Sequence, residues 1–334
     1  MYVGTYASDV HVISEADFSV VARIPATAGI PGGLLATPDG RRLVAPTIDY
    51  EWVEIFDVET RRSVDRFTLT ERNAKMRIQS MAVHPNGRHV VLMARRYEKL
   101  RDRWDIGDME FFLYDMAEKR RMQDVPWPGG ERQETRSSFG FSADGRHFFF
   151  FADDVHIYDT ETYDEVDAWD YSGALDEGMG DFRFGFSQTP REEPDWYAGF
   201  FRVQEDIQDR TVLGFARANP IERRVEATVL GPAEMGPQGS FALAPDRTRA
   251  YALRQEVGNY QLWGIDLASG EAHHVVFPGR PRMSLEVSSN GRFLYIYAAG
   301  NTIDVYDART LQLRHTIDLD ADMTIGRLWI LPGG

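Results

Sequence analysis

Arginine residues recur at one position ahead of the turns in this sequence, and guanidinium groups are well suited to bind carboxylate or phosphate. Three of them precede the glycine of an Asp-Gly or Asn-Gly pair by nine or ten residues, namely Arg77, Arg136 and Arg282. Gln238 takes the matching place before another turn of this kind. Arg183 and Arg327 lie about two residues further along the strands that are predicted to precede these turns. In a chain of net charge −15, guanidinium groups gathered at one opening would focus positive potential on a small anion. The alternative is that each pairs with an aspartate or glutamate of a neighbouring repeat.

No motif of the sequence supports a catalytic centre or a metal site. The eight histidines include no His-Glu-x-x-His pattern, and the adjacent His273 and His274 would point to opposite faces of a strand. Asp318, Asp320 and Asp322 resemble the start of a calcium-binding loop, but the glycine and the terminal glutamate of such a loop are absent. Nucleophile-elbow, phosphate-loop and dinucleotide-binding patterns are also missing. We therefore assign no catalytic residue, no metal and no cofactor to this chain.

The elements that must position these residues follow from an internal repeat. One recurring phrase is an apolar alternating run, a turn rich in Pro, Asp, Asn and Gly, and a second apolar run. The turn occurs at Pro38-Asp39-Gly40, Pro85-Asn86-Gly87, Ala143-Asp144-Gly145, Pro245-Asp246-Arg247, Ser289-Asn290-Gly291 and, in a degenerate form, Gln188-Thr189-Pro190. Asx-Gly pairs favour tight hairpins because both residues tolerate positive φ.

A second phrase follows each turn and consists of an apolar pair that ends on an aspartate. It reads Ile55-Phe56-Asp57, Leu113-Tyr114-Asp115, Ile157-Tyr158-Asp159, Gly264-Ile265-Asp266 and Val305-Tyr306-Asp307, with weaker copies at Val12-Ile13-Ser14 and Gly214-Phe215-Ala216. The seven copies are 41 to 58 residues apart. The aromatic residues before these aspartates recur with the repeat, so we expect them in the core.

Repeats of this length with tight hairpins predict four antiparallel strands each, which is the architecture of a propeller blade. The sequence therefore predicts one all-β domain over residues 1–334, a seven-bladed β-propeller with four-stranded antiparallel blades. Residues 1–6, 9–13 and 19–24 supply only three strands of the first blade. We expect residues 326–331, near the C-terminus, to supply the fourth strand and close the ring.

Two insertions interrupt the repeat. The first, residues 95–108, is charged, contains Trp104 and lies between the second and third strands of the third blade. The second consists of acidic loops around the degenerate blade, at residues 170–179, 191–196 and 203–210. Long loops on a rigid scaffold often carry function, and exposed aromatic residues there favour a protein partner. Trp104 and Trp196 are therefore candidates for a partner surface, with burial against the ring as the alternative.

With these features together, the chain resembles the YVTN-type β-propellers, and more closely the β subunit of quinohemoprotein amine dehydrogenase. The matching segments run from Asp9-Val10-His11-Val12-Ile13 near the start to Ser284–Gly291 and Ile303–Leu311 near the end. The segment from Phe200-Phe201 to Glu205-Asp206-Ile207 is the least generic of the matches, because Asp-Gly turns occur in every YVTN propeller.

The resemblance implies a non-catalytic subunit. In that family a small cysteine-rich subunit carries the quinone and a cytochrome subunit carries the haems, while the propeller provides the surface on which they assemble. A chain without cysteine is compatible with this role. The resemblance thus predicts quinone-bearing and cytochrome subunits as protein partners and a periplasmic location. Residues 1–6 lack the charged and apolar parts of an export signal, which instead fits the cytoplasm.

The composition disfavours several other partners. Hydrophobic residues make up 43% of the chain and aromatic residues 12%, enough for a continuous core. The net charge of −15 disfavours binding to nucleic acid or to an anionic membrane, since that binding depends on Lys and Arg. No apolar run approaches the length of a membrane span.

Two further functions stay open from the sequence. One is a stand-alone propeller enzyme, of lactonase, isomerase or lyase type, that binds a small anionic substrate at an arginine-lined channel mouth. The opening Tyr2-Val3-Gly4-Thr5-Tyr6 is similar to that of propeller lactonases acting on phosphogluconate, but no convergent acid, histidine and arginine motif accompanies it. The other is a general interaction platform for an unidentified protein, which an exposed apolar patch around Trp104 would favour.

Overall fold

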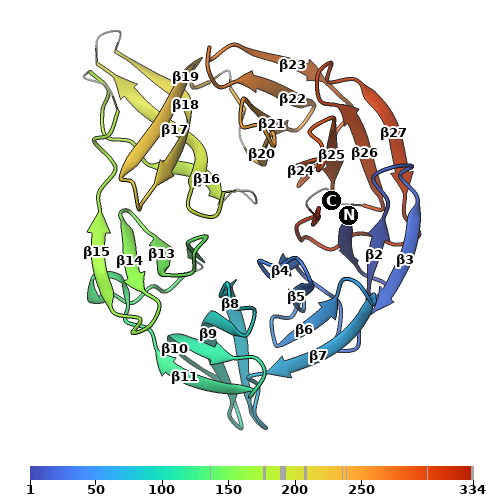
Figure 1. The fold of residues 1–334 in the computed structure, drawn as a ribbon, viewed down its shortest axis with the longest axis vertical. Coiled ribbons are helices and arrows are strands. Elements are labelled where there is room, and N and C mark those ends of the chain that lie inside the picture. Colours follow the sequence, from blue (N-terminus) through green and yellow to red (C-terminus); the bar gives the residue numbers. More distant parts are fainter. Residues whose placement is uncertain are drawn as a thin grey trace. The chain divides into compact units, whose positions relative to one another are not determined.

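Seven antiparallel β-sheets account for almost all regular structure in the described part of the chain (Figure 1). The structure is a computed structural model that describes residues 1–135, 137–175, 178–188, 193–206, 209–234, 236–237, 239–298 and 300–331. Its contacts group the chain into two units: Met1–Ala168 with Met323–Trp329, and Trp169–Asp322 with the residues from Ile330 onward. The all-β class is confirmed, and one domain over residues 1–334 stays a prediction.

In unit 1, each sheet is built from consecutive strands that pair in chain order. Sheet 1 contains β1 (Tyr2–Thr5), β2 (Asp9–Ile13) and β3 (Val20–Pro25). Sheet 2 contains β4 (Leu35–Ala36), β5 (Arg42–Pro46), β6 (Trp52–Asp57) and β7 (Arg62–Thr68). Sheet 3 contains β8 (Ala74–Val83), β9 (His89–Lys99), β10 (Trp104–Asp115) and β11 (Arg120–Asp124). Sheet 4 contains β12 (Ser138–Phe141), β13 (His147–Phe151), β14 (Val155–Asp159) and β15 (Glu165–Trp169), and the division into units falls at the end of β15.

Unit 2 follows the same plan. Sheet 5 contains β16 (Phe184–Gln188), β17 (Tyr197–Glu205), β18 (Arg210–Asn219) and β19 (Arg224–Pro232). Sheet 6 contains β20 (Phe241–Leu243), β21 (Arg249–Glu256), β22 (Asn259–Asp266) and β23 (Ala272–Val276). Sheet 7 contains β24 (Ser284–Val287), β25 (Phe293–Tyr297), β26 (Thr302–Asp307) and β27 (Leu313–Asp318).

Helical structure in the described residues amounts to one short 3₁₀ turn, η1 (Pro128–Gly130), between sheets 3 and 4. None of the described helical structure has the length and apolar character needed to cross a membrane.

The C-terminal segment pairs with the first strand, as the sequence predicted for the incomplete sheet 1. The Tyr2 and Trp329 backbones exchange hydrogen bonds of 2.7 and 2.8 Å, and the Thr324 N–H donates to the Gly4 carbonyl at 3.0 Å. The Thr324 hydroxyl also donates to the carbonyls of Gly4 and Gly32, at 3.1 Å each. The contact consists of isolated bridges at Tyr2–Trp329 and Thr5–Met323 in place of the continuous strand that we expected over residues 326–331.

The Asx-Gly turns have the predicted backbone. Gly40, Gly87, Gly145 and Gly291 have φ between 66° and 72°, and Arg247 replaces the glycine in sheet 6 at φ 63°. The aspartate or asparagine side chain caps each turn, as where Asp39 accepts a hydrogen bond from the Arg41 N–H at 3.0 Å. The degenerate turn predicted at residues 188–190 includes residues outside the described part of the chain.

The residue that ends the third strand organises the next turn. In sheet 3, the Asp115 carboxylate accepts from the backbone N–H groups of Ala117 at 2.9 Å and Glu118 at 3.0 Å. In sheet 5, Asn219 plays this part, since its side-chain oxygen accepts from Ile221 and Glu222 at 3.0 Å each. The assignment of the fifth copy to Gly214–Ala216 was therefore wrong by three residues, because an asparagine had replaced the aspartate that marks the phrase.

The cores lie between adjacent sheets, and the recurring aromatic residues belong to them as predicted. Phe56, Tyr114, Tyr158 and Tyr306 are all buried. Between sheets 3 and 4 the rings pack closely: the Phe111 ring lies 5.6 Å from the Phe150 ring in an edge-on contact. Aromatic pairs at this spacing add to the stabilisation that burial provides.

One buried carboxylate ties the chain that enters sheet 2 to the sheet itself. Glu54, on β6, accepts hydrogen bonds from the Thr27 N–H at 2.9 Å and the Ala28 N–H at 2.9 Å, and from the hydroxyls of Thr27 and Ser63. These donors satisfy a charged group that would otherwise be costly to bury. Glu54 thus has a structural role.

The first insertion is not the loop that its polar composition suggested. Residues 95–108 continue β9 and β10 as a long hairpin with its turn at residues 100–103, where the Leu100 N–H donates to the Arg103 carbonyl at 2.8 Å. β8 is lengthened along with it and pairs with β9 from Ala74. Strands in this hairpin consist mainly of polar residues, so a search of the sequence for apolar runs does not find them.

Candidate functional site

The structure places the predicted arginines of unit 1 in different surroundings. Arg77 was expected at the start of a strand, but β8 begins at Ala74, and Arg77 lies within it opposite Arg95. The longer hairpin explains this difference. Arg327 lies in the C-terminal segment with its guanidinium 5.8 Å from the Trp329 ring, and it lines a pocket of about 390 Å³ with residues that include Tyr6 and Ile78. Arg77 does not line that pocket.

The predicted arginines of unit 2 are also held separately. Arg183 directly precedes β16, where its guanidinium lies 3.6 Å from the Asp170 carboxylate and 5.7 Å from the Tyr171 ring. Arg183 thus pairs with a carboxylate of the segment between β15 and β16. Arg282 is exposed in a turn just before β24, with a positive φ of 62°. Arg136 and Gln238 lie outside the described residues, and binding of an anion by these six residues stays a prediction.

The projecting end of sheet 3, formed by β8, β9 and β10 beyond Ile78, Ala94 and Met109, is here named the arm (Figure 1). Residues that pair directly across antiparallel strands share a face, and alternate residues along a strand do so too. The pairs Lys75–Tyr97, Arg77–Arg95, Lys99–Trp104 and Tyr97–Ile106 therefore place seven side chains on one face. This face carries four cations, two aromatic rings and an isoleucine.

The arm face is open to solvent at its apolar end. Trp104 is 47% exposed and Ile106 is 59% exposed. Nearer the body of the sheet, the Arg77 guanidinium lies 5.3 Å from the Tyr97 ring centre, and Arg95 pairs with Glu134. The two tryptophans predicted at a partner surface thus differ in exposure. Trp196 is half-buried, and the guanidiniums of Arg217 and Arg224 lie 4.7 and 5.1 Å from its ring centre.

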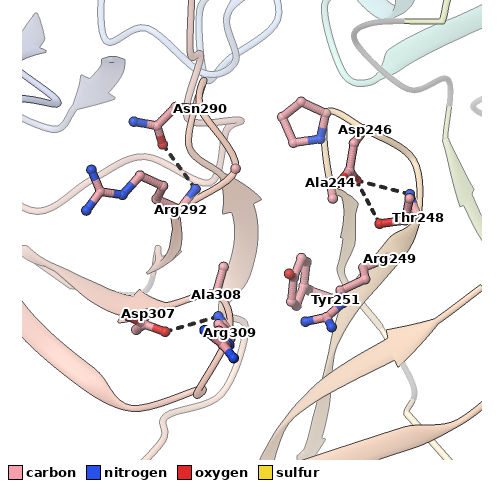
Figure 2. A pocket seen from close by; sticks show the side chains of 12 residues that line it. Ala244, Asp246, Thr248, Arg249, Tyr251, Asn290, Arg292, Asp307, Ala308 and Arg309 are labelled. Atoms are coloured by element: carbon pink, nitrogen blue, oxygen red, sulfur yellow. Dashed lines mark hydrogen bonds between the residues drawn. The ribbon is translucent and has the colours of Figure 1, made fainter.

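A second feature is a cleft of about 730 Å³ between sheets 6 and 7, here named the 6/7 cleft (Figure 2). Its walls are the turn that joins β20 to β21, the turn that joins β24 to β25, and the turn that follows β26. All three are turns that the repeat itself produces. The cleft is therefore built on the rigid ends of strands.

Three arginines line the 6/7 cleft, and among the described residues none of them is within ion-pair distance of a carboxylate. Figure 2 shows Arg249 and Arg309 on opposite walls with their guanidiniums in the lower part of the view, while Arg292 extends along the sheet 7 side. Tyr251 lies beside Arg249, and burial raises the pKa of its hydroxyl, an effect that Arg249 opposes. The hydroxyl is therefore a neutral donor at neutral pH.

The two carboxylates of the 6/7 cleft are committed to their own turns. Asp246 accepts from the Thr248 N–H at 3.1 Å and from the Thr248 hydroxyl at 2.9 Å. Asp307 accepts from the backbone N–H groups of Arg309 and Thr310, which hold the pKa of its carboxyl below the ordinary value. This site was not predicted from the sequence, because Arg249, Arg292 and Arg309 fall at different points of two repeats and only the fold places them in one cleft.

Within the described residues no group of three or more histidine, cysteine or acidic side chains could hold a metal ion. The two carboxylates of the 6/7 cleft contact backbone N–H groups, a hydroxyl or a cation instead. The candidate sites are thus a charged, aromatic surface and an arginine-lined cleft.

Comparison with known proteins supports the fold. No family model matches the sequence, and no curated protein matches it. Among solved structures, Kuenenia stuttgartiensis hydrazine synthase is 11% identical with a TM-score of 0.54, over 94% of this chain and 90% of that one. The dihydro-heme d1 dehydrogenase NirN, solved in complex with DHE, is 15% identical with a TM-score of 0.55, over 97% of this chain and 73% of that one.

These similarities, together with seven antiparallel sheets in the described residues, define the class of the protein: it is a seven-bladed β-propeller. At such low identity the similarity concerns the fold alone, so it transfers neither activity nor ligand.

Proposed function

We propose that this chain is a non-catalytic propeller scaffold that binds an acidic protein partner through the arm of sheet 3. The observation that carries the proposal is the arm face, where Trp104 and Ile106 are exposed beside a row of cations. In a chain of net charge −15, such a face is a local exception. A rigid strand hairpin presents it without a conformational change.

The apolar end of the arm has the character of a binding surface. Tryptophan and isoleucine side chains that are about half exposed leave apolar area in water, and burial against a partner would recover roughly 25 cal/mol per Å². Tryptophan and arginine are also the residue types that most often dominate interface energies. The tip of the arm is therefore suited to anchor a partner.

The charges of the arm indicate the chemistry of that partner. Arg77 and Arg95 are directly opposite on paired strands, an arrangement that destabilises a sheet when the charges are alike. Glu134 offsets the charge of Arg95, but among the described residues Arg77 is paired with no carboxylate. An acidic partner surface would neutralise Arg77 and Lys99, which supports a partner with exposed aspartate or glutamate.

In its finer form the proposal follows the resemblance to the β subunit of quinohemoprotein amine dehydrogenase. The partners are then a small quinone-bearing subunit and a cytochrome subunit, and this chain itself holds no cofactor. One structural neighbour is a dihydro-heme d1 dehydrogenase, and its haem chemistry is a property of that protein. The finer form rests on the sequence resemblance.

Purification of the tagged full-length chain from its native source tests the proposal. We expect a stoichiometric partner that carries acidic surface, with haem absorbance and quinone staining if the finer form holds. The double variant Trp104→Ser/Ile106→Ser should lose that partner, and the charge reversals Arg77→Glu and Lys99→Glu should weaken it, most strongly at low salt.

The matched control is Val166→Ser, since Val166 is 58% exposed on β15, as Ile106 is on β10. This variant should keep the partner. A partner without haem or quinone would refute the amine dehydrogenase assignment and leave the scaffold role. A chain that purifies alone, or a partner unaffected by the arm variants, would contradict the proposal as a whole.

A further inference from the structure

The 6/7 cleft carries a second inference, which is independent of the scaffold role. We propose that this cleft binds a small molecule with two or more carboxylate or phosphoryl groups, held between Arg249 and Arg309 with Arg292 at the rim. Three features of the cleft support this: the charge of its lining, the ion-pair partner of Asp307 in sheet 7, and the contrast with an equivalent cleft in unit 1.

Arg292 differs from the equivalent arginine of sheet 3 in its ion pairing. In sheet 3, the equivalent arginine after the Asx-Gly turn is Arg88, whose guanidinium binds Asp115 at 2.8 and 2.6 Å. In sheet 7, the equivalent carboxylate is Asp307, but Arg314 from β27 binds it at 3.2 Å. Arg314 thus occupies in sheet 7 the acceptor that Arg88 uses in sheet 3, and Arg292 has no carboxylate within ion-pair distance among the described residues.

The lining of the 6/7 cleft also differs in charge from that of an equivalent cleft. The 6/7 cleft is lined by three arginines and two aspartates, and one of these aspartates is neutralised by Arg314 from outside the lining. The equivalent cleft between sheets 2 and 3, of about 600 Å³, is lined by three arginines and four carboxylates. The repeat therefore produces the hollow in both places, but of these two linings only that of the 6/7 cleft contains more arginines than carboxylates.

The size of the cleft and the placement of its donors indicate the kind of ligand. A cleft of about 730 Å³ has the size of a site for a small molecule. Guanidiniums on two walls favour a ligand with at least two anionic groups, because each guanidinium can bind one carboxylate or phosphoryl group in a bidentate manner. The Tyr251 hydroxyl beside Arg249 supplies a neutral donor for a further oxygen. Carboxylate and phosphoryl groups meet these donors equally well.

The experiment is calorimetric titration of the full-length chain at low ionic strength with citrate, pyrophosphate and acetate. We expect saturable binding of citrate, pyrophosphate or both with one site per chain, and none of acetate. Tighter binding of citrate would indicate a carboxylate ligand, and tighter binding of pyrophosphate a phosphoryl ligand. Added salt should weaken the binding. Arg249→Gln/Arg309→Gln should weaken it by about tenfold or more, since each lost bond is to a charged group.

The matched control is Arg41→Gln/Arg42→Gln, which removes two cations from the cleft between sheets 2 and 3 and should leave binding unchanged. Near-ultraviolet circular dichroism checks that each variant is folded, and the exposed single variant Arg292→Gln should weaken binding without any loss of stability. The proposal is overturned if neither citrate nor pyrophosphate saturates the wild-type chain. It is equally overturned if Arg249→Gln/Arg309→Gln binds as tightly as wild type, or if the control variant is weakened as much.

Discussion

At the scale of single residues, Asp115 shows how the repeat uses its aspartates. Its carboxylate is 1% exposed, binds Arg88, and accepts two backbone N–H groups of the turn that follows β10. These bonds hold the pKa of the carboxyl well below its ordinary value of 3.8, chiefly through Arg88. An aspartate in this state stabilises a turn and has no proton to exchange at neutral pH.

The substitution Asp115→Asn keeps an oxygen for the turn and removes the charge that binds Arg88. We expect the free energy of unfolding at pH 7 to fall by about 1.5 kcal/mol, the low end for a bond to a charged group, because Arg88 is 51% exposed. A folded-state pKa below the unfolded one contributes stability above the unfolded pKa that is lost as the pH falls. The difference between wild type and variant should therefore shrink between about pH 5 and about pH 2.

Urea unfolding of both proteins over that pH range measures the effect. Asp124→Asn serves as a control, since Asp124 is 77% exposed in its pair with Arg121 and such pairs contribute little. A difference between wild type and Asp115→Asn that stays constant with pH would show that the charge of Asp115 is not involved.

At the scale of elements, the hairpin turns depend on glycines with left-handed backbone. Gly40 and Gly145 have φ of 66° and 71° in equivalent turns of sheets 2 and 4. A Cβ at Gly40 would meet nothing within 4 Å, whereas a Cβ at Gly145 would lie 3.2 Å from two side-chain carbons of Pro85. The two sites therefore share a backbone requirement and differ in packing.

Gly40→Ala should lower the free energy of unfolding by about 1 kcal/mol, the backbone cost of a left-handed alanine. Gly145→Ala should cost more, because the added methyl also presses on the ring of Pro85 in sheet 3. Thermal or urea unfolding of the two variants measures the difference. If both variants lose the same free energy of unfolding, the backbone cost alone explains both losses. A larger loss for Gly40→Ala would contradict a role for the contact with Pro85.

At the scale of the whole molecule, the chain ends meet in sheet 1. Met323 and Leu328 are buried, and the backbone of the same segment is hydrogen-bonded to Tyr2 and Gly4. Deletion of residues 323–334 would remove this fourth element and expose the edge of β1. Edge strands that lose their partner also invite pairing between molecules.

We expect that deletion to lower the free energy of unfolding by roughly 5 kcal/mol or more, since it removes four buried side chains and several backbone bonds. Addition of a synthetic peptide that spans residues 320–334 should restore part of the melting temperature. Calorimetry and size-exclusion chromatography measure stability and association. A truncated chain that melts like the full-length protein would show that the terminal pairing contributes little.

The sequence allowed the fold to be predicted because its information is local. Asx-Gly pairs dictate tight turns, and the aspartates at the strand ends cap the turns that follow, so seven copies could be counted along the chain. The prediction failed where the local signal was altered: Asn219 replaces the aspartate in sheet 5. It also failed where polar residues form strands, as in the hairpin of Trp104.

The sites were predicted less well, for a physical reason. Trp104 was found from the sequence because an aromatic residue inside a charged insertion is itself a signal. The arginines near the starts of strands were chosen by spacing, but the charge of a site depends on which carboxylates lie nearby, and Asp170 already pairs with Arg183. Spacing along the chain carries no information about that balance.

The sequence by itself determined the all-β class, the repeat and the turns, because hydrogen bonds between near neighbours encode them. The completion of sheet 1 by the C-terminal segment followed from the count of strands, since the first repeat lacks one strand. The tertiary structure decided which charged groups meet. Arg292 follows its turn just as Arg88 does, yet Arg88 binds the aspartate that ends the third strand, whereas in sheet 7 Arg314 binds it. Electrostatic balance depends on distances between side chains from separate strands, and only the packed sheets set those distances.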